Sequence, residues 1–272
     1  MNIPFHKPYI GKEELTSVCE TLNSGWLTMG PKTIEFENAF KDYIGSDFAI
    51  SVNSATAALH LALNAIGIGK DDEVIIPTNT FVATAEVIMY LGAKPILCDI
   101  KNSNHNIDER LIDKLITSKT KAIIPVHFGG HPCEMDEILN LAKYNNIYVI
   151  EDAAHALPSK YKNKMIGSIA DATCFSFYAT KTLTTGEGGM VTTNSPKIAK
   201  KIKIQRLHGI SSDAWNRYGN KNDWYYEVVD LGYKYNTTDL QSSIGLVQLK
   251  KLEWMNKRRK YIAEKYINSF FG

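Results

Sequence analysis

Apolar and polar positions alternate along this chain in two patterns. Short runs of apolar and β-branched residues recur, and longer segments with apolar residues at helical spacing lie between them. The short runs predict strands at residues 48–52, 73–76, 95–100, 122–126, 147–151, 173–177 and 190–193. The longer segments predict helices at 55–66, 80–91, 108–116 and 134–144. This alternation is typical of an α/β fold with a mostly parallel sheet and helices on both faces.

The last part of the chain follows a different pattern. Residues 207–235 are rich in aromatic residues, Asn and Gly without a clear period, which predicts long loops. From Asp239 to the end, apolar spacing predicts one long helix, with an N-cap near Thr237 and Thr238. We therefore divide the chain into a large domain, 1–238, and a long helix, 239–272.

Composition narrows the class of protein. The 31 Lys and Arg residues nearly balance the 29 Asp and Glu residues, so bulk charge does not attract nucleic acid or an anionic membrane. The four cysteines are far apart and form no CxxC pair, which argues against a disulfide framework and a zinc module. We find neither a signal peptide nor an apolar run long enough to cross a bilayer. We expect a soluble, cytoplasmic protein.

Residues able to do chemistry follow the predicted strands, where ligands bind in such sheets. The segment 53–56 opens the helix after the first strand, and the free backbone N–H groups there, with the hydroxyls of Ser54 and Thr56 as further donors, suit a phosphate. An ordinary helix cap is the alternative. Phe81, after the second strand, is either a platform for a flat ring or the first core residue of a helix.

Three ionisable candidates follow later strands. Asp152 and His155 come after strand 147–151, and a carboxylate at the end of a buried strand is costly without a cation or a donor. The alternative is an Asp that caps a turn, with His155 bonded to the backbone. Lys181 lies in a weakly charged, Gly-flanked stretch after strand 173–177, where desolvation favours the neutral amine that Schiff-base chemistry needs. A solvated surface lysine is the alternative.

Competing motifs are weak. The Gly186-Glu187-Gly188-Gly189 run lacks the spacing and the following helix of a dinucleotide fingerprint, and no P-loop sequence occurs. A turn around Pro132 is a better interpretation than a metal site for His127, His131, Cys133 and Asp136, so we predict no metal. Pyridoxal phosphate accounts for the strand ends together, because it needs an anion cradle, an aromatic face, a carboxylate at the pyridine nitrogen and a lysine.

Several stretches also resemble the DegT/DnrJ/StrS family of sugar aminotransferases, in the order that the family has them. They are Asn53–His60, Thr80–Thr84, Gly92–Pro95, Pro125–His127, Glu151–Ala156, Phe175–Lys181, Leu207–Ile210 and Gly232–Asn236. Within the family, the chain looks closest to the branch that aminates UDP-4-keto-pentose sugars and related 4-keto-6-deoxy sugars. The resemblance implies the large domain of a fold-type I, pyridoxal phosphate-dependent aminotransferase with a seven-stranded, mostly parallel sheet.

The resemblance also implies a role for each site residue. Lys181 is the Schiff-base lysine, Asp152 pairs with the pyridine nitrogen, and His155 lies beside the phenolic oxygen. Phe81 stacks on the ring, and the phosphate is held by Ala55, Thr56 and Ser176.

A homodimer is implied as well. In the commoner Gly-Tyr-Asn-Tyr-Arg motif an Asn reaches the phosphate across the dimer interface. Here Lys234 takes that place and Asn236 replaces the Arg, so both are candidates for the contact. The implied reaction moves the amino group of glutamate to a nucleotide-linked keto sugar, for cell-surface polysaccharide or lipopolysaccharide synthesis.

Two other functions stay open at this point. One is a sugar dehydratase of the same family, in which a histidine replaces the lysine, so Lys181 favours transamination. The other is a protein that keeps the fold without turnover, because relatives continue into a small C-terminal domain that covers the cleft and excludes water. We expect the 272-residue chain to lack that domain, to be weakly active or inactive, and to aggregate.

Overall fold

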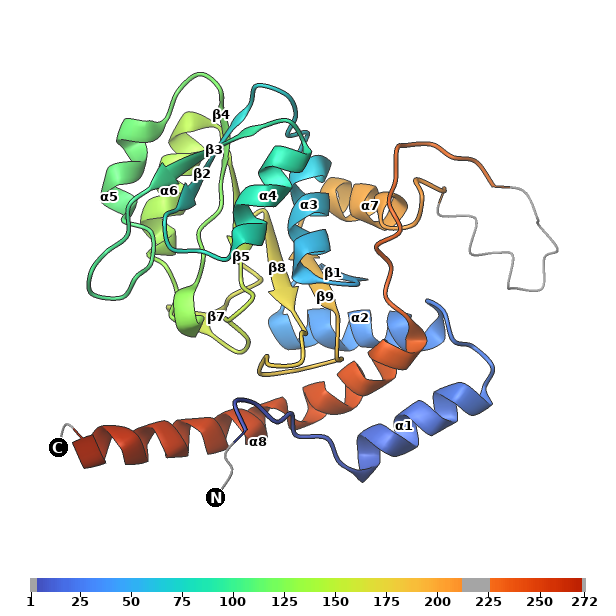
Figure 1. Cartoon of the computed structure of the whole chain (residues 1–272). Helices are drawn as coiled ribbons and strands as arrows, with labels where there is room; N and C mark the ends of the chain where they lie inside the picture. Colours follow the sequence, from blue (N-terminus) through green and yellow to red (C-terminus); the bar gives the residue numbers. More distant parts are fainter. Residues whose placement is uncertain (1–3, 212–225, 271–272) are drawn as a thin grey trace.

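A single seven-stranded sheet forms the centre of the molecule. The computed structural model describes residues 4–211 and 226–270 (Figure 1). The strands lie in the order β1-β9-β8-β5-β4-β2-β3. Their bounds are β1 Phe48–Val52, β2 Glu73–Pro77, β3 Lys94–Cys98, β4 Thr120–Ile123, β5 Tyr148–Asp152, β8 Ala172–Ser176 and β9 Gly189–Thr193. Strand β9 runs antiparallel to β1 and β8, and the other pairings in the sheet are parallel. The predicted α/β class and mostly parallel sheet are confirmed, with strand ends shifted by a few residues.

Helices cover both faces of this sheet, as predicted. One face packs against α3 (Ala55–Ala65), α4 (Val82–Tyr90) and α7 (Pro196–Gln205). The other face packs against α5 (Glu109–Ile112) and α6 (Met135–Asn145) at one end and against α2 (Pro31–Ile44) and α8 (Asp239–Phe270) at the other. A short hairpin of β6 (Lys160–Tyr161) and β7 (Lys164–Met165) was not predicted.

The side-chain alternation of β5 matters for the site. Ile150 packs in the core on the α3 and α4 face, whereas Val149 packs in the core on the α5 and α6 face. Successive residues of a strand point to opposite faces. Asp152 therefore lies on the α4 side and Glu151 on the α6 side.

Helices α1 (Lys12–Asn23) and α2 were not assigned from the sequence. They pack with α8 into one group of helices beside the sheet (Figure 1). Helix α2 has ordinary boundary signals, with Pro31 in its first turn and Gly45 in the left-handed region at φ 79° after its end. Its two buried rings, Phe36 and Phe40, face Leu249 and Leu252 of α8 in one core cluster.

The start of α8 joins distant parts of the chain. Thr238 and Gln241 form reciprocal side-chain to backbone hydrogen bonds of 3.1 and 3.2 Å, so the predicted N-cap region is confirmed at Thr238. The next residue, Asp239, accepts hydrogen bonds from the N–H groups of Gly30, Lys32 and Thr33, and thereby caps α2.

The predicted long helix at the end of the chain is confirmed. Its buried residues lie between Asp239 and Met255, and Tyr261, Tyr266 and Phe270 further on are exposed. The division at residue 238 stays a prediction. No helix in the described ranges combines the length and apolarity needed to span a bilayer.

Candidate active site

A cavity of about 610 Å³ opens where the parallel strands end. The segments after β1, β2, β5 and β8 supply most of its wall. The predicted residues that line it are Ala55, Thr56, Phe81, Asp152, His155, Ser176 and Lys181. Asn236 is not among the lining residues. The structure thus brings together candidates that lie far apart in the sequence, because the carboxyl ends of parallel strands meet at one edge.

One wall of the cavity is a cradle for an anion. The Ser54 hydroxyl accepts the N–H of Ala57 at 3.0 Å, and the first intrahelical bond of α3 starts from Ala58. The N–H groups of Ala55 and Thr56 are therefore left without intrahelical partners, at the positive end of the helix dipole.

A glycine makes this cradle possible. A Cβ atom added at Gly189, the first residue of β9, would lie 2.5 Å from the carbonyl oxygen of Ser54 and 2.8 Å from the nitrogen of Ala55. Only a residue without a side chain lets the first turn of α3 lie this close to β9. The residues present therefore fit a phosphate group.

Asp152 is held rigidly on the opposite wall. It is 5% exposed, its Oδ2 accepts the Thr84 hydroxyl at 2.9 Å, and its Oδ1 accepts the Ala154 N–H at 3.1 Å. Its backbone N–H donates to the Pro125 carbonyl at 2.9 Å, and its carbonyl accepts the His127 N–H at 3.2 Å. This carboxylate lines the cavity and suits a cationic ring nitrogen.

Two basic side chains share the cavity with Asp152. Burial lowers the pKa of Lys181 below that of an ordinary lysine, and the negative charge of Asp152 opposes this shift. Burial and then the positive charge of Lys181 lower the pKa of His155, again against Asp152. A lowered lysine pKa increases the fraction of neutral, nucleophilic amine. Lys181 is half-buried, so it is not the solvated surface lysine of the alternative interpretation.

Phe81 is not a core residue. Its side chain is 75% exposed at the N-cap position of α4, and it lines the cavity. The alternative in which it begins the core of a helix is therefore wrong, and its ring face is available to a flat ligand.

Asn236 lies outside the cavity, in an extended segment that α3 holds in place. The rings of Tyr233 and Tyr235 stack at 5.0 Å and contact His60 of α3, and the Tyr235 carbonyl accepts the Asn53 N–H at 2.8 Å. Because side chains alternate along an extended segment, Lys234 and Asn236 lie on the side away from the two tyrosine rings. Lys234 is exposed, whereas the Asn236 amide donates to the Thr237 carbonyl at 3.0 Å.

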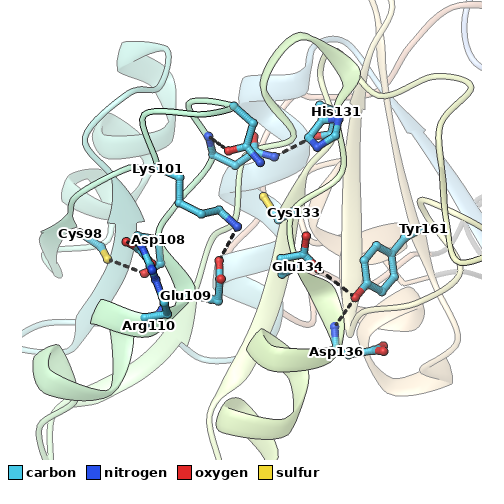
Figure 2. A network of polar contacts seen from close by, with 12 residues as sticks. Cys98, Lys101, Asp108, Glu109, Arg110, His131, Cys133, Glu134, Asp136 and Tyr161 are labelled. Carbon is cyan, nitrogen blue, oxygen red and sulfur yellow. Dashed lines mark hydrogen bonds and ion pairs between the residues drawn. The ribbon is translucent and has the colours of Figure 1, made fainter.

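The side chains of the four residues considered as metal ligands do not converge on one point. His127 contacts Glu151 in the interior, and the Cys133 N–H donates to His127 Nδ1 at 3.1 Å. The His131 carbonyl accepts from Asn106, and the Asp136 N–H contacts the Tyr161 hydroxyl in the polar network of Figure 2. The Asp136 carboxylate also pairs with Lys162. In the part of the chain that is described, no three His, Cys, Asp or Glu side chains gather in a group able to hold a metal ion.

Sequence reasoning missed several residues of the site. Thr84, behind the cavity wall, holds Asp152, while Phe128 and Tyr178 line the cavity. Thr84 was inside a stretch that resembles the family, and its spacing of four residues from Thr80, within the predicted helix 80–91, was a usable signal.

The sheet and its lysine-containing cavity define a pyridoxal phosphate-dependent aminotransferase of fold-type I. The sequence matches the DegT/DnrJ/EryC1/StrS aminotransferase family over residues 8–271, and the chain belongs to this family. The predicted family, fold class and enzyme class are thereby confirmed, and the cofactor is pyridoxal 5′-phosphate.

Relatives and solved structures agree with this assignment. The chain is 53% identical to the spore coat polysaccharide biosynthesis protein SpsC of Bacillus subtilis, over 98% of this chain and 69% of the relative. It is 59% identical to a protein of Methanocaldococcus jannaschii, with the same coverage. The pyridoxal phosphate form of Spr1654 from Streptococcus pneumoniae, described as a sugar aminotransferase, superimposes with a TM-score of 0.93 at 38% identity, over 100% of this chain and 72% of that one. Helicobacter pylori PseC, an aminotransferase involved in pseudoaminic acid biosynthesis, superimposes with a TM-score of 0.91 at 36% identity. The match covers 98% of this chain and 70% of that one.

Proposed function

We propose that this chain transfers the amino group of glutamate to the 4-keto group of a nucleotide-linked sugar, for cell-surface polysaccharide or lipopolysaccharide synthesis. The observation that carries the proposal is the cavity of about 610 Å³ that Lys181, Asp152 and the first turn of α3 share. This volume is in the range of cofactor and small-molecule sites. The family of sugar aminotransferases and the polysaccharide role in the name of SpsC support a sugar as the amino acceptor.

The binding roles follow from the donors and acceptors along the cavity. We assign the phosphate to the N–H groups of Ala55 and Thr56, with the Ser176 hydroxyl beside them. The exposed ring of Phe81 covers one face of the cofactor ring. The pyridine ring, once bound, withdraws electrons from the bond that breaks at the amino donor.

The proton-handling roles belong to three side chains. The Asp152 carboxylate holds a proton on the ring nitrogen by direct charge attraction. Lys181 would be the attachment point, and once an amino donor had displaced it, its Nζ would take the proton from the donor's α-carbon and deliver it to the C4′ carbon of the cofactor. Burial lowers the pKa of His155, which favours the neutral imidazole, and this side chain would lie beside the phenolic oxygen of the cofactor.

We also propose that the protein works as a homodimer, with the segment of Lys234 and Asn236 reaching the cofactor of the neighbouring subunit. The exposure of Lys234 and its position away from the tyrosine stack support Lys234 as the contact. Light scattering should give twice the chain mass. A monomer that still binds the cofactor tightly would contradict the dimer.

The direct test mixes purified protein and pyridoxal phosphate with glutamate and a set of nucleotide-linked 4-keto and 3-keto sugars. We expect slow formation of 2-oxoglutarate and a 4-amino sugar, detected by mass, with no product from Lys181→Ala. Lys200→Ala, a substitution of an exposed lysine on α7, is the control and should leave the rate unchanged. Product from 3-keto sugars alone would refute the 4-keto assignment, and amination without 2-oxoglutarate would refute glutamate as the donor.

A further inference from the structure

The Asp152 carboxylate has a donor that lies outside the cavity. The Thr84 hydroxyl is 2.9 Å from Asp152 Oδ2, and Thr84 is 0% exposed. The lining of the cavity includes its neighbour Ala83 but not Thr84. Thr84 therefore acts on a ligand only through Asp152.

The protons of this contact have a single consistent arrangement. An ionised carboxylate only accepts hydrogen bonds, so the Thr84 hydroxyl must donate its one proton to Asp152. The Thr80 hydroxyl lies 2.7 Å from the Thr84 hydroxyl, and it must then be the donor in that pair. The result is a directed chain from Thr80, on the cavity wall, through Thr84 to Asp152.

The side-chain hydrogen bond of Thr84 differs from the one that a threonine in a helix usually makes. A threonine within a helix commonly returns its hydroxyl to the carbonyl four residues earlier. Here the Thr84 hydroxyl crosses to the end of β5 instead, and a hydrogen bond to a charged acceptor is stronger than one to a neutral carbonyl.

The same turn of helix carries the aromatic residue of the site. The Thr84 N–H donates to the Phe81 carbonyl at 3.1 Å, and Phe81 is the N-cap of α4. The position of the carboxylate is thereby tied to the position of the ring that faces the ligand.

We propose that Thr84 is a positioning residue for the aminotransferase reaction, with Thr80 as its own donor. It keeps the Asp152 carboxylate aimed at the protonated ring nitrogen of the cofactor. The inference rests on the proposed role of Asp152. Thr84, at the buried end of α4, would thus contribute to the strength with which the protein binds the ring nitrogen.

The test compares pyridoxal phosphate with the analogue in which C–H replaces the ring nitrogen. Both keep the aldehyde and the phosphate, and only the first can pair with Asp152. Thr84→Val removes the hydroxyl at nearly constant shape. We expect it to weaken equilibrium binding of pyridoxal phosphate about tenfold and to leave binding of the analogue unchanged. Thr84→Ser restores the hydroxyl and should restore the binding.

Matched variants isolate the effect. Thr192→Val removes another fully buried hydroxyl, which donates to the Gly167 carbonyl at 2.7 Å, and should change neither affinity. Thr80→Val should weaken binding of pyridoxal phosphate alone, by about twofold to threefold, and it keeps the test available if Thr84→Val does not fold.

Two results would overturn the proposal. One is equal weakening of the cofactor and its analogue in Thr84→Val, which would mean that Thr84 only fills space. The other is unchanged affinity for both. Asp152→Asn separates these outcomes from a failure of the proposed function. Suppose that Asp152→Asn abolishes the preference for pyridoxal phosphate over the analogue and that Thr84→Val does not reduce it. The positioning role of Thr84 is then refuted, and the role of Asp152 is not. If Asp152→Asn keeps the preference, the assignment of Asp152 itself is wrong.

Discussion

Two neighbouring carboxylates at the end of β5 have opposite surroundings. Glu151 is 0% exposed, with Oε1 3.2 Å from His127 Nε2 and Oε2 accepting the Thr173 hydroxyl. Asp152 is almost as buried, but it lines the cavity. The difference arises from strand alternation alone, which sends Glu151 toward α6 and Asp152 toward α4. Burial of a charged group is therefore no sign of function unless part of its surface faces a cavity.

The largest expected effect is a loss of reaction rate when Asp152, the carboxylate that faces the cavity, is changed. Asp152→Asn keeps the shape and removes the charge that holds the ring nitrogen protonated. We expect kcat to fall about 100-fold or more, while the free energy of unfolding changes by less than about 1 kcal/mol. Steady-state rates and urea unfolding of the cofactor-free protein measure the two quantities. A loss of stability as large as the loss of rate would remove the distinction between the two carboxylates.

A change beside Glu151, on the interior side of β5, should lower stability and leave the reaction rate nearly unchanged. His127→Ala leaves the buried Glu151 carboxylate without its imidazole neighbour and opens a cavity. We expect the free energy of unfolding to fall by about 3 kcal/mol, with kcat of the folded fraction within a few-fold of normal. His131→Ala, at an exposed histidine nearby, is the control for urea unfolding. Full stability of His127→Ala would show that Glu151 does not need this partner.

A smaller effect, on cofactor affinity, is expected at Gly189, where the backbones of β9 and α3 lie close together. Gly189→Ala places a Cβ atom against the Ser54 carbonyl and should displace the first turn of α3. We expect pyridoxal phosphate to bind about tenfold more weakly, as measured by equilibrium dialysis. Gly69→Ala is the matched control, because a Cβ atom there has no neighbour within 4 Å. Equal affinities of the two variants would mean that the cradle is less rigid than its contacts indicate.

The smallest expected effect is a shift in the pH at which the rate of cofactor attachment to Lys181 is half-maximal. Attachment of the cofactor requires neutral Lys181, so its rate rises as pH passes through the pKa of Lys181. Burial lowers that pKa, and the charge of Asp152 raises it. The midpoint should thus lie below that of an exposed lysine, and Asp152→Asn should move it to still lower pH. Absorbance-monitored mixing at several pH values measures it. Thr173→Val, on the Glu151 side, should leave the midpoint in place, and a rise in Asp152→Asn would contradict the assigned charge effect.

The sequence predicted the strands and most of the site for one physical reason. Parallel strands end at a common edge, so Lys181, Asp152 and Ala55 could be placed together without any knowledge of their contacts. The family resemblance, and not the pattern, supplied their individual roles.

What the sequence missed depends on contacts between distant segments. The pairing of Glu151 with His127 depends on which face each strand residue takes. The hydrogen bond from Thr84 to Asp152 joins residues 68 positions apart. The exposure of Phe81 was equally hidden, since a helix-start Phe has the same local pattern whether it faces the core or a cavity. Helix α2 packs on α8, from the other end of the chain, and no local period reveals that contact.

The capping of α2 by Asp239 has a consequence for synthesis on the ribosome. Gly30 and Asp239 are 209 residues apart, and the leucines that cover Phe36 and Phe40 come later still. While the chain is being made, α2 thus emerges with an uncapped N-terminus and two bare phenylalanine rings. Contacts of such long sequence separation form late and leave apolar surface exposed to other chains in the meantime. Helix α2 must therefore wait for residues that follow it by about 200 positions before it can take its native place.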